Sequence, residues 1–279
     1  MAIELAQDYL KYVDELFTTE SRLSLLTNKN FTFNGTSAIK IYKVSTASMV
    51  DYVRDGALPA GQWSRYGLVE GLDATTETFQ LNKDRSFTFA IDRLDAEETK
   101  RNLEAAGALA RQLREVVIPE IDKHVYSVLC SDAGQKPSRE PITSGNIYDL
   151  VIQANNLLDV AEVPEAGRVI VITPDIHLLM KKSPDIIMET NIGNELRIRG
   201  VIGTLDGLTV LRVPANRLPN DFGFLIAHPV ACCAPVKLDS YKIHENPPGI
   251  SGSLVEGRIN YDAFVLDNKA NAIVYQEGN

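Results

Sequence analysis

Residues 95–129 read DAEETKRNLEAAGALARQLREVVIPEIDKHVYSVL, and this stretch decides the fold of the chain. Its apolar residues recur at spacings of three and four, the period of one buried face of an α-helix. They are Leu103, Ala106, Ala110, Leu113, Val117, Ile121, Val125 and Val128. At about 1.5 Å per residue the helix would be roughly 50 Å long, which is long for a soluble domain. We therefore expect a long core helix around which the rest of the chain is organised.

Two features mark the start and the middle of this predicted helix. Asp95 is a suitable N-cap residue, and Glu98 completes a capping-box pattern that satisfies free backbone N–H groups. Pro119 has no N–H to donate and its ring crowds the preceding turn, so it should kink or break the helix near Val116. We expect one long helix with a defect in its second half.

The first segment, residues 3–26, also has a helical pattern, with a wide apolar stripe that includes Leu16 and Phe17. The stripe is wider than a peripheral helix needs to cover its own domain. It could cover this chain or dock on a neighbouring chain, and both possibilities remain open. Residues 31–43 then alternate between apolar and polar side chains, which predicts a strand.

Residues 45–73 show no clear helix or strand. Glycines punctuate the segment, and Trp63 and Tyr66 are two of its few large aromatic residues. About 30 residues without regular structure are unusual inside a compact domain. We expect an extended, polar excursion of the chain.

Alternating side chains on both sides of a turn predict a β-hairpin directly after this excursion. The alternating stretches are residues 76–81 and 87–91, and the turn is Asn82-Lys83-Asp84-Arg85. Residues 39–91 would then form one long two-stranded ribbon. An isolated ribbon is marginal in water, so we expect it to rest on something else, such as another subunit.

The sequence after the long helix predicts a compact mixed α/β region. Two further helices are expected, over residues 147–158 and 174–179, the second with Thr173 as its N-cap and Pro174 in its first turn. The β-branched run of residues 168–173 predicts a buried strand. Further strands are expected over residues 196–202, 208–213, 224–227, 236–243, 254–265 and 272–275.

Composition excludes several classes of protein. The 279 residues are 44% hydrophobic and 23% charged, as in ordinary globular proteins. The net charge of −9 argues against tight binding of nucleic acid through a basic surface. No apolar run is long enough to span a membrane, and the first residues do not resemble a signal peptide. We therefore expect a chain that is made and kept in the cytoplasm.

The residues that most often carry chemistry do not form a known motif. The four histidines, His124, His177, His228 and His244, have no metal-ligand spacing. Of the three cysteines, Cys130, Cys232 and Cys233, the adjacent pair lies in an apolar setting typical of buried reduced thiols. There is no phosphate-binding loop, dinucleotide-binding glycine pattern or nucleophile elbow. We expect no catalytic, cofactor or metal site.

Several local strings, taken together with the order of the elements, resemble one known family. The strings are Val44-Ser-Thr-Ala47 followed by Ser64-Arg65-Tyr66-Gly67, Asp84-Arg85-Ser86-Phe87-Thr88-Phe89 with Ile91-Asp92, and residues 110–122 around Pro119. They resemble the extended loop, the strand after it and the spine helix of major capsid proteins of tailed bacteriophages. Members from phages and prophages of Gram-positive bacteria are the most similar. The resemblance covers essentially the whole chain.

The resemblance implies an α+β fold of the Hong Kong 97 type. Residues 1–38 would be an N-terminal arm and residues 39–93 an extended β loop lying across a neighbouring subunit. Residues 94–145, with the long spine helix, and the return strands of 236–279 would form a peripheral domain. Residues 146–235 would form an axial domain around five-fold and six-fold axes.

The resemblance also implies the function of a major capsid protein that assembles with itself, as pentamers and hexamers, into an icosahedral shell around packaged double-stranded DNA. No cofactor is implied. Its partners would be other copies, a separate scaffolding protein, a portal and the enclosed DNA, without sequence-specific binding and without a membrane. It would reside in the virion, and in the host cytoplasm during assembly. Candidate interface residues are Leu16, Phe17, Trp63, Arg65, Tyr66, Lys83 and Arg85.

Two properties of some family members are not expected here. Some weld subunits through a lysine–asparagine bond, and Lys83 at the predicted hairpin tip is a candidate, but no motif assigns it. Non-covalent assembly is therefore the expectation. Others carry a cleavable N-terminal scaffolding segment, and the early start of the ribbon leaves no room for one, so we expect an uncleaved chain.

Two alternatives stay open. An encapsulin, a bacterial nanocompartment with the same fold, encloses cargo enzymes and binds a cargo peptide partly through an N-terminal helix, which residues 3–26 could supply. A soluble α/β enzyme with Cys232 or Cys233 as nucleophile would need a nearby base and a lowered thiol pKa, for which the sequence offers no sign.

Overall fold

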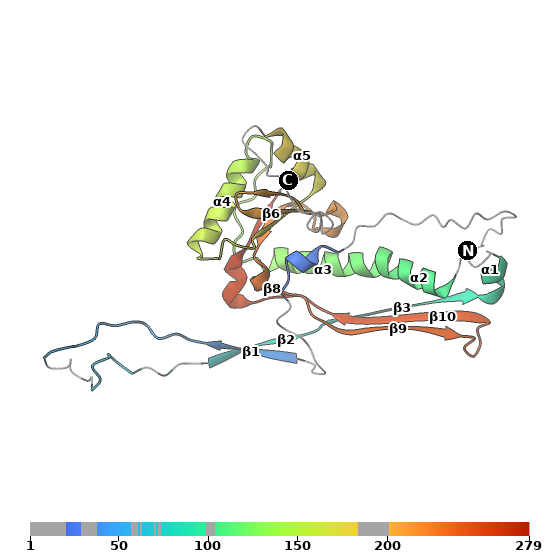
Figure 1. Ribbon diagram of the computed structural model, residues 1–279, viewed down its shortest axis with the longest axis horizontal. Helices are drawn as coiled ribbons and strands as arrows, with labels where there is room; N and C mark the ends of the chain where they lie inside the picture. Colours follow the sequence, from blue (N-terminus) through green and yellow to red (C-terminus); the bar gives the residue numbers. More distant parts are fainter. Residues whose placement is uncertain are drawn as a thin grey trace. The chain divides into compact units, whose positions relative to one another are not determined.

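The structure is a computed structural model that describes residues 21–28, 38–56, 61, 63–69, 71, 74–98, 104–183 and 201–278 (Figure 1). The chain divides into two compact units. The smaller unit is Gly35–Leu81, and the larger comprises Met1–Asn34 and Asn82–Asn279. Each unit is described separately below. The predicted apolar stripe with Leu16 and Phe17 lies outside the described residues.

A five-stranded sheet forms the centre of the larger unit, with strand order β12-β7-β4-β6-β5. Strands β4 and β6 are parallel, whereas every other neighbouring pair is antiparallel. The strands are β4 (Val169–Ile172), β5 (Val201–Leu205), β6 (Leu208–Arg212), β7 (Phe222–Ala227) and β12 (Ile273–Glu277).

Both faces of this sheet are covered, which explains why β4 is apolar at every position. Ile170 and Ile172 pack in one core with α4 (Ile147–Val160) and α5 (Pro174–Lys182). Val169 and Val171 point the other way and pack with Val125, Tyr126 and Leu129 of α3 (Ile118–Ser131). Since all four residues of β4 are buried, the prediction of a buried strand from its β-branched run is confirmed.

The two helices on the first face begin as their sequences predict. At α5, the Thr173 hydroxyl accepts a hydrogen bond from the Ile176 N–H at 3.2 Å, and Pro174 occupies the first turn. Helix α4 buries one side, through Ile147, Leu150, Val151, Ala154 and Leu158.

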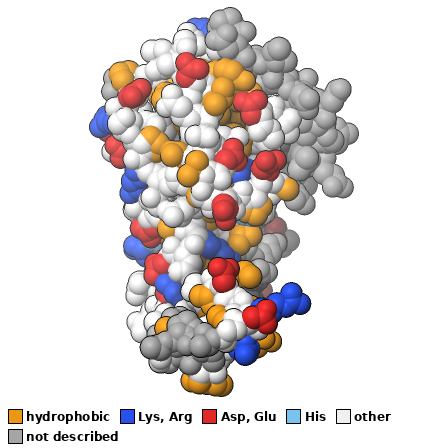
Figure 2. Space-filling model, turned by 90° about the vertical axis from the view of Figure 1, so that its left-hand side faces the viewer, with side chains coloured by type: hydrophobic (Ala, Val, Ile, Leu, Met, Phe, Trp, Pro, Cys, Tyr) orange, Lys and Arg blue, Asp and Glu red, His pale blue; other side chains and the backbone are white. Residues whose placement is uncertain are grey.

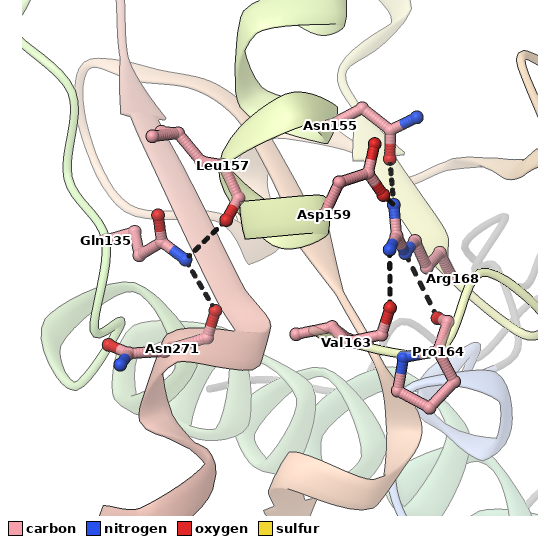
Figure 3. Close-up of polar contacts among 8 residues, drawn as sticks. All are labelled: Gln135, Asn155, Leu157, Asp159, Val163, Pro164, Arg168 and Asn271. Atoms are coloured by element: carbon pink, nitrogen blue, oxygen red, sulfur yellow. Dashed lines mark hydrogen bonds and ion pairs between the residues drawn. The ribbon is translucent and has the colours of Figure 1, made fainter. Parts of the chain in front are cut away.

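Arg168, only 2% exposed, ties the end of α4 to the start of β4 (Figure 3). Its guanidinium donates to the Asn155 side chain at 2.6 Å and to the carbonyls of Val163 and Pro164 at 2.5 and 3.1 Å. The Asp159 carboxylate lies 2.7 Å away and supplies the opposite charge. A buried arginine requires this full set of partners, because an unpaired buried charge is costly.

The predicted single helix from Asp95 is wrong in its first part, because Glu104 is extended and a separate helix begins at Ala105. Helix α1 (Arg93–Glu98) precedes α2 (Ala105–Gln112), a π-helical turn at Leu113–Val117, and α3. The prediction of Asp95 as N-cap is also wrong, because α1 begins at Arg93. The Asp92 carboxylate accepts a hydrogen bond from the Leu94 N–H at 2.8 Å. Asp95 instead lies in the first turn, where its charge favours the helix dipole.

The predicted defect near Val116 is confirmed, and it takes the form of the π turn. Ile118 donates its N–H to the carbonyl of Leu113, five residues earlier. Pro119 follows directly, within the first turn of α3, where its missing donor and its ring are accommodated. The chain therefore continues as helix through the proline.

A three-stranded antiparallel sheet, ordered β3-β10-β9, packs against this helix. The strands are β3 (Lys83–Asp92), β9 (Val236–Glu245) and β10 (Gly252–Tyr261). Val117 of the π turn is buried with Ile259 and Tyr261 of β10, and Phe87, Leu113 and Ile121 pack around them. A short pair, β8 (Cys232–Cys233) and β11 (Phe264–Val265), completes the strands of this unit that the structure describes.

The predicted hairpin is wrong. Strand β2 (Ala74–Gln80) pairs with β1 (Ala38–Val44), whereas β3 pairs with β10 in the larger unit. Alternation identifies the two faces of a strand but not its partner. Between β2 and β3, the Asn82 N–H donates to the Asp262 carboxylate at 2.9 Å, which fixes the chain on the larger unit at that point. Lys83 is consequently the first residue of β3 and not the tip of a hairpin.

The smaller unit is a two-stranded ribbon with a long loop at one end. Strands β1 and β2 are antiparallel, and Lys43 and Glu77 form an ion pair across them at 2.9 Å. Among the side chains of this unit whose burial the structure describes, no apolar one is fully buried.

The start of β10 generates a prediction about stability. Gly252 has φ +143°, and a Cβ there would overlap the carbonyl oxygen of Ile91. Gly252→Ala should therefore lower the free energy of unfolding by about 1–3 kcal/mol. Gly107→Ala is the matched control, because Gly107 lies in α2 with open space around it. It should stabilise the protein by up to about 1 kcal/mol.

Denaturant unfolding followed by circular dichroism measures both changes. Equal effects of the two substitutions would contradict this description of the β3–β10 contact.

Candidate assembly surfaces

The loop of the smaller unit exposes a group of large apolar side chains, which we call the aromatic loop surface. Trp63 is 80% exposed and Tyr66 is 78% exposed. Further members, all more than half exposed, are Met49, Val50, Tyr52, Leu68 and Val69. Such a concentration of apolar surface on one loop is typical of a protein–protein interface.

Local hydrogen bonds join two segments of this loop. The Val53 N–H donates to the Arg65 carbonyl at 3.0 Å, and the Arg65 side chain donates to the carbonyls of Val53 and Arg54 at 3.0 and 2.9 Å. The rings of Tyr52 and Tyr66 meet edge to face, 4.9 Å apart. Arg65, predicted as an interface residue, thus bridges two segments of the loop within its own chain.

Two further predicted interface residues among the described ones, Lys83 and Arg85, lie in the larger unit. Arg85 on β3 pairs with Glu120 on α3 at 2.7 Å, with side chains 62% and 42% exposed. Because both side chains are exposed, both groups are accessible to another molecule. An ion pair this exposed contributes little to the stability of the subunit. Lys83 is exposed at the start of the same strand.

A buried polar network that the sequence did not reveal holds the first described residues. Asp122 on α3 accepts hydrogen bonds from Arg217 and from the Ser21 hydroxyl, each at 2.6 Å. Burial raises the pKa of Asp122, although the bonds from Ser21 and Arg217 and the charge of Arg217 oppose that shift. The neighbouring Arg22 donates to the Arg212 carbonyl.

This network, with the buried side chains of Leu23 and Leu26, anchors residues 21–26 on the core of the larger unit. Sequence periodicity places Asp122 beside the buried helix face, and a carboxylate in such a position usually has a charged or hydrogen-bonding partner. Its partner could not be found in this way, because Arg217 lies 95 residues further along the chain.

No catalytic or metal centre emerges from the described residues. They contain no group of three or more His, Cys, Asp or Glu side chains able to hold a metal ion. All three cysteines are buried, and burial raises the pKa of Cys130 and of Cys232 to about 12. His124 forms a hydrogen bond with the Asp262 carboxylate at 2.7 Å, and that carboxylate also accepts the Asn82 N–H. The pair therefore links α3 to the chain segment before β3.

None of the described helices combines the length and apolar character needed to cross a bilayer. On the face seen in Figure 2, the described acidic, basic and apolar side chains are interspersed, without a continuous field of Lys and Arg. This distribution fits the net charge of −9.

Comparisons with known proteins identify the fold. No protein-family model matches the sequence, and no curated protein matches it significantly. Among solved structures, one from Mycobacterium phage Che8 has a TM-score of 0.73 at 20% identity, covering 100% of this chain and 98% of that one. The capsid structure of cyanophage P-SCSP1u has a TM-score of 0.75 at 11% identity, covering 98% and 93%.

A virus-like particle from Pyrococcus furiosus is also similar, with a TM-score of 0.55 at 12% identity and 92% coverage of both chains. The phage structures thus agree with this chain over nearly its full length, whereas the particle agrees less closely. The chain is a mixed α and β protein with the fold of phage capsid structures.

Proposed function

We propose that this chain is the major shell protein of a tailed phage or prophage and assembles with itself into an icosahedral head of the Hong Kong 97 type. The observation that carries the proposal is the smaller unit, which has paired strands and exposed aromatic residues but no fully buried apolar side chain among those whose burial the structure describes. A ribbon of this kind needs another surface to rest on. The similarity of nearly the whole chain to phage capsid structures supports the choice of a shell protein.

The proposed roles follow the two units. The smaller unit is the extended loop, which lies on a neighbouring subunit. Helix α1, the continuous helix from α2 to α3, and the sheet β3-β10-β9 form the peripheral domain. The five-stranded sheet with α4 and α5 forms the axial domain, which gathers around the symmetry axes. Relative to the sequence-based boundaries, β3 moves from the extended loop to the peripheral domain, because it pairs with β10.

The proposed partners are other copies of this chain, a separate scaffolding protein, a portal and the packaged double-stranded DNA. The net charge of −9 suits a container whose inner wall should not grip its contents tightly. The place of action would be the virion. Assembly without a covalent bond between subunits remains our preferred mode.

An encapsulin-like nanocompartment is the second candidate, favoured by the similarity to the Pyrococcus furiosus virus-like particle. The two candidates differ in what the shell encloses. Particles isolated from the cells that naturally make this chain should hold double-stranded DNA if the first proposal is correct. They should hold protein cargo if the second proposal is correct.

The proposal predicts that the purified chain assembles into closed, curved shells. Each apolar surface buried between copies contributes about 25 cal/mol per Å², and many identical contacts act together in a shell. Negative-stain electron microscopy over a range of protein concentrations checks this, and co-expressed scaffolding protein should narrow the range of diameters. A chain that stays a monomer or a small closed oligomer under all of these conditions would refute the proposal.

A further prediction separates a shell protein from a cysteine-dependent enzyme. With pKa values of about 12 for Cys130 and Cys232, only about one thiol in ten thousand is ionised at pH 8. Iodoacetamide should therefore leave the native protein unmodified over hours, while the urea-unfolded protein, as a control, reacts at all three cysteines. Rapid modification of Cys232 or Cys233 in the native protein, measured by intact mass, would revive the enzyme interpretation.

A further inference from the structure

A pocket of about 170 Å³ lies beside the π turn, between the long helix and the three-stranded sheet of the larger unit. Its apolar lining comes from both layers and includes Phe87, Val117, Ile121, Ile259 and Tyr261. At its mouth are the exposed Arg85–Glu120 ion pair and Val116, which is 45% exposed. The pocket is thus apolar within and charged at its rim.

The size of the pocket indicates what it can hold. Pockets for small-molecule ligands usually measure about 300–1,000 Å³, whereas an apolar cavity of about 150 Å³ binds a single benzene molecule. The 170 Å³ of this pocket therefore suits one aromatic side chain.

The charged rim of the pocket favours an indole among the aromatic side chains. The Arg85 guanidinium can lie against the face of a ring, and this attraction is strongest for tryptophan. The Glu120 carboxylate already accepts a bond from Arg85 at 2.7 Å and has further lone pairs for an indole N–H. An indole therefore fits the pocket and its rim better than an aliphatic side chain does.

Trp63 is the only tryptophan of the chain. It is 80% exposed at the aromatic loop surface, whereas the rings of Tyr52 and Tyr66 already pack on each other. Tryptophan is also among the residues most often found at the energetic centre of protein interfaces. Trp63 belongs to the smaller unit and the pocket to the larger unit, and in the proposed assembly a second copy offers a pocket to each Trp63.

We infer that Trp63 of one copy inserts its indole ring into the pocket beside the π turn of a second copy. The inference rests on the proposed self-assembly and adds to it a defined contact between the aromatic loop surface and the helix–sheet layer. In this contact the ring would cover Val116 and Val117, and the Arg85–Glu120 pair would close over its edge.

Disulfide trapping tests the contact in assembled particles of the full-length chain. The variant Trp63→Cys/Val116→Cys should form disulfide-linked multimers on mild oxidation, which appear as a ladder in non-reducing electrophoresis. The native cysteines are buried and give little background. Both substituted positions are exposed, so the subunit should fold normally. Trp63→Cys/Thr88→Cys is the matched control, because Thr88 is exposed on β3 between the inward-facing Phe87 and Phe89 and should give no ladder.

The fluorescence of Trp63 gives an independent measurement without cross-linking. In the wild-type chain its emission should shift to shorter wavelength on assembly, and quenching by acrylamide should decrease. In the Val116→Arg variant, which blocks the mouth of the pocket, the emission of Trp63 should stay at the wavelength of the unassembled subunit.

The outcomes separate this inference from the proposed function. Wild-type shells together with an absent ladder, or with an equal ladder in the Thr88 control, would overturn the inference and leave the proposed function intact. A ladder from Leu16→Cys/Val116→Cys in place of the Trp63 pair would assign the pocket to the N-terminal segment and also overturn it. A wild-type chain that forms no shells would overturn both.

Discussion

In the proposed assembly, the ribbon of the smaller unit depends on a surface that another copy provides. Strands β1 and β2 satisfy each other's backbone hydrogen bonds, but hydrogen bonds alone add little net stability. Apolar burial is the dominant favourable term in folding, and none of the apolar side chains of this unit whose burial is described is more than partly buried. The same residues would supply it if another copy covered them. Folding of the ribbon and association of the subunits would then be one process.

The larger unit is built in the opposite way, since it buries both faces of its central sheet. The helix from α2 to α3 serves two layers: α3 packs on the five-stranded sheet, and the π turn packs on the three-stranded sheet. Asp122 and Arg217 add a buried charge pair that joins this helix to the first described residues of the chain. Removing one partner of such a pair leaves a buried charge uncompensated, which makes it a fixed point of the structure. The larger unit can therefore act as a rigid body.

Local patterns were sufficient to predict the features that depend on local chemistry. The apolar run of β4, the Thr173 cap of α5 and the defect near Pro119 are each set by neighbouring residues in the sequence. The partner of a strand is not set in this way, and β3 was therefore assigned to the wrong sheet. The same limit hid Arg217, the partner of Asp122, and the pocket formed by β3, β10 and the helix. Among the predicted interface residues, Trp63 and Tyr66 are exposed in the single chain, while Arg65 supports its own loop.

Amide hydrogen exchange on dissociated subunits and on assembled particles tests most directly whether the ribbon is stabilised by another copy. The account predicts fast exchange for β1 and β2 in the dissociated subunit and strong protection of the same strands in the particle, because exchange reports local opening. Strands β4 and β7 should be protected in both states and serve as the internal reference. Equal protection of β1 and β2 before and after assembly would contradict the account.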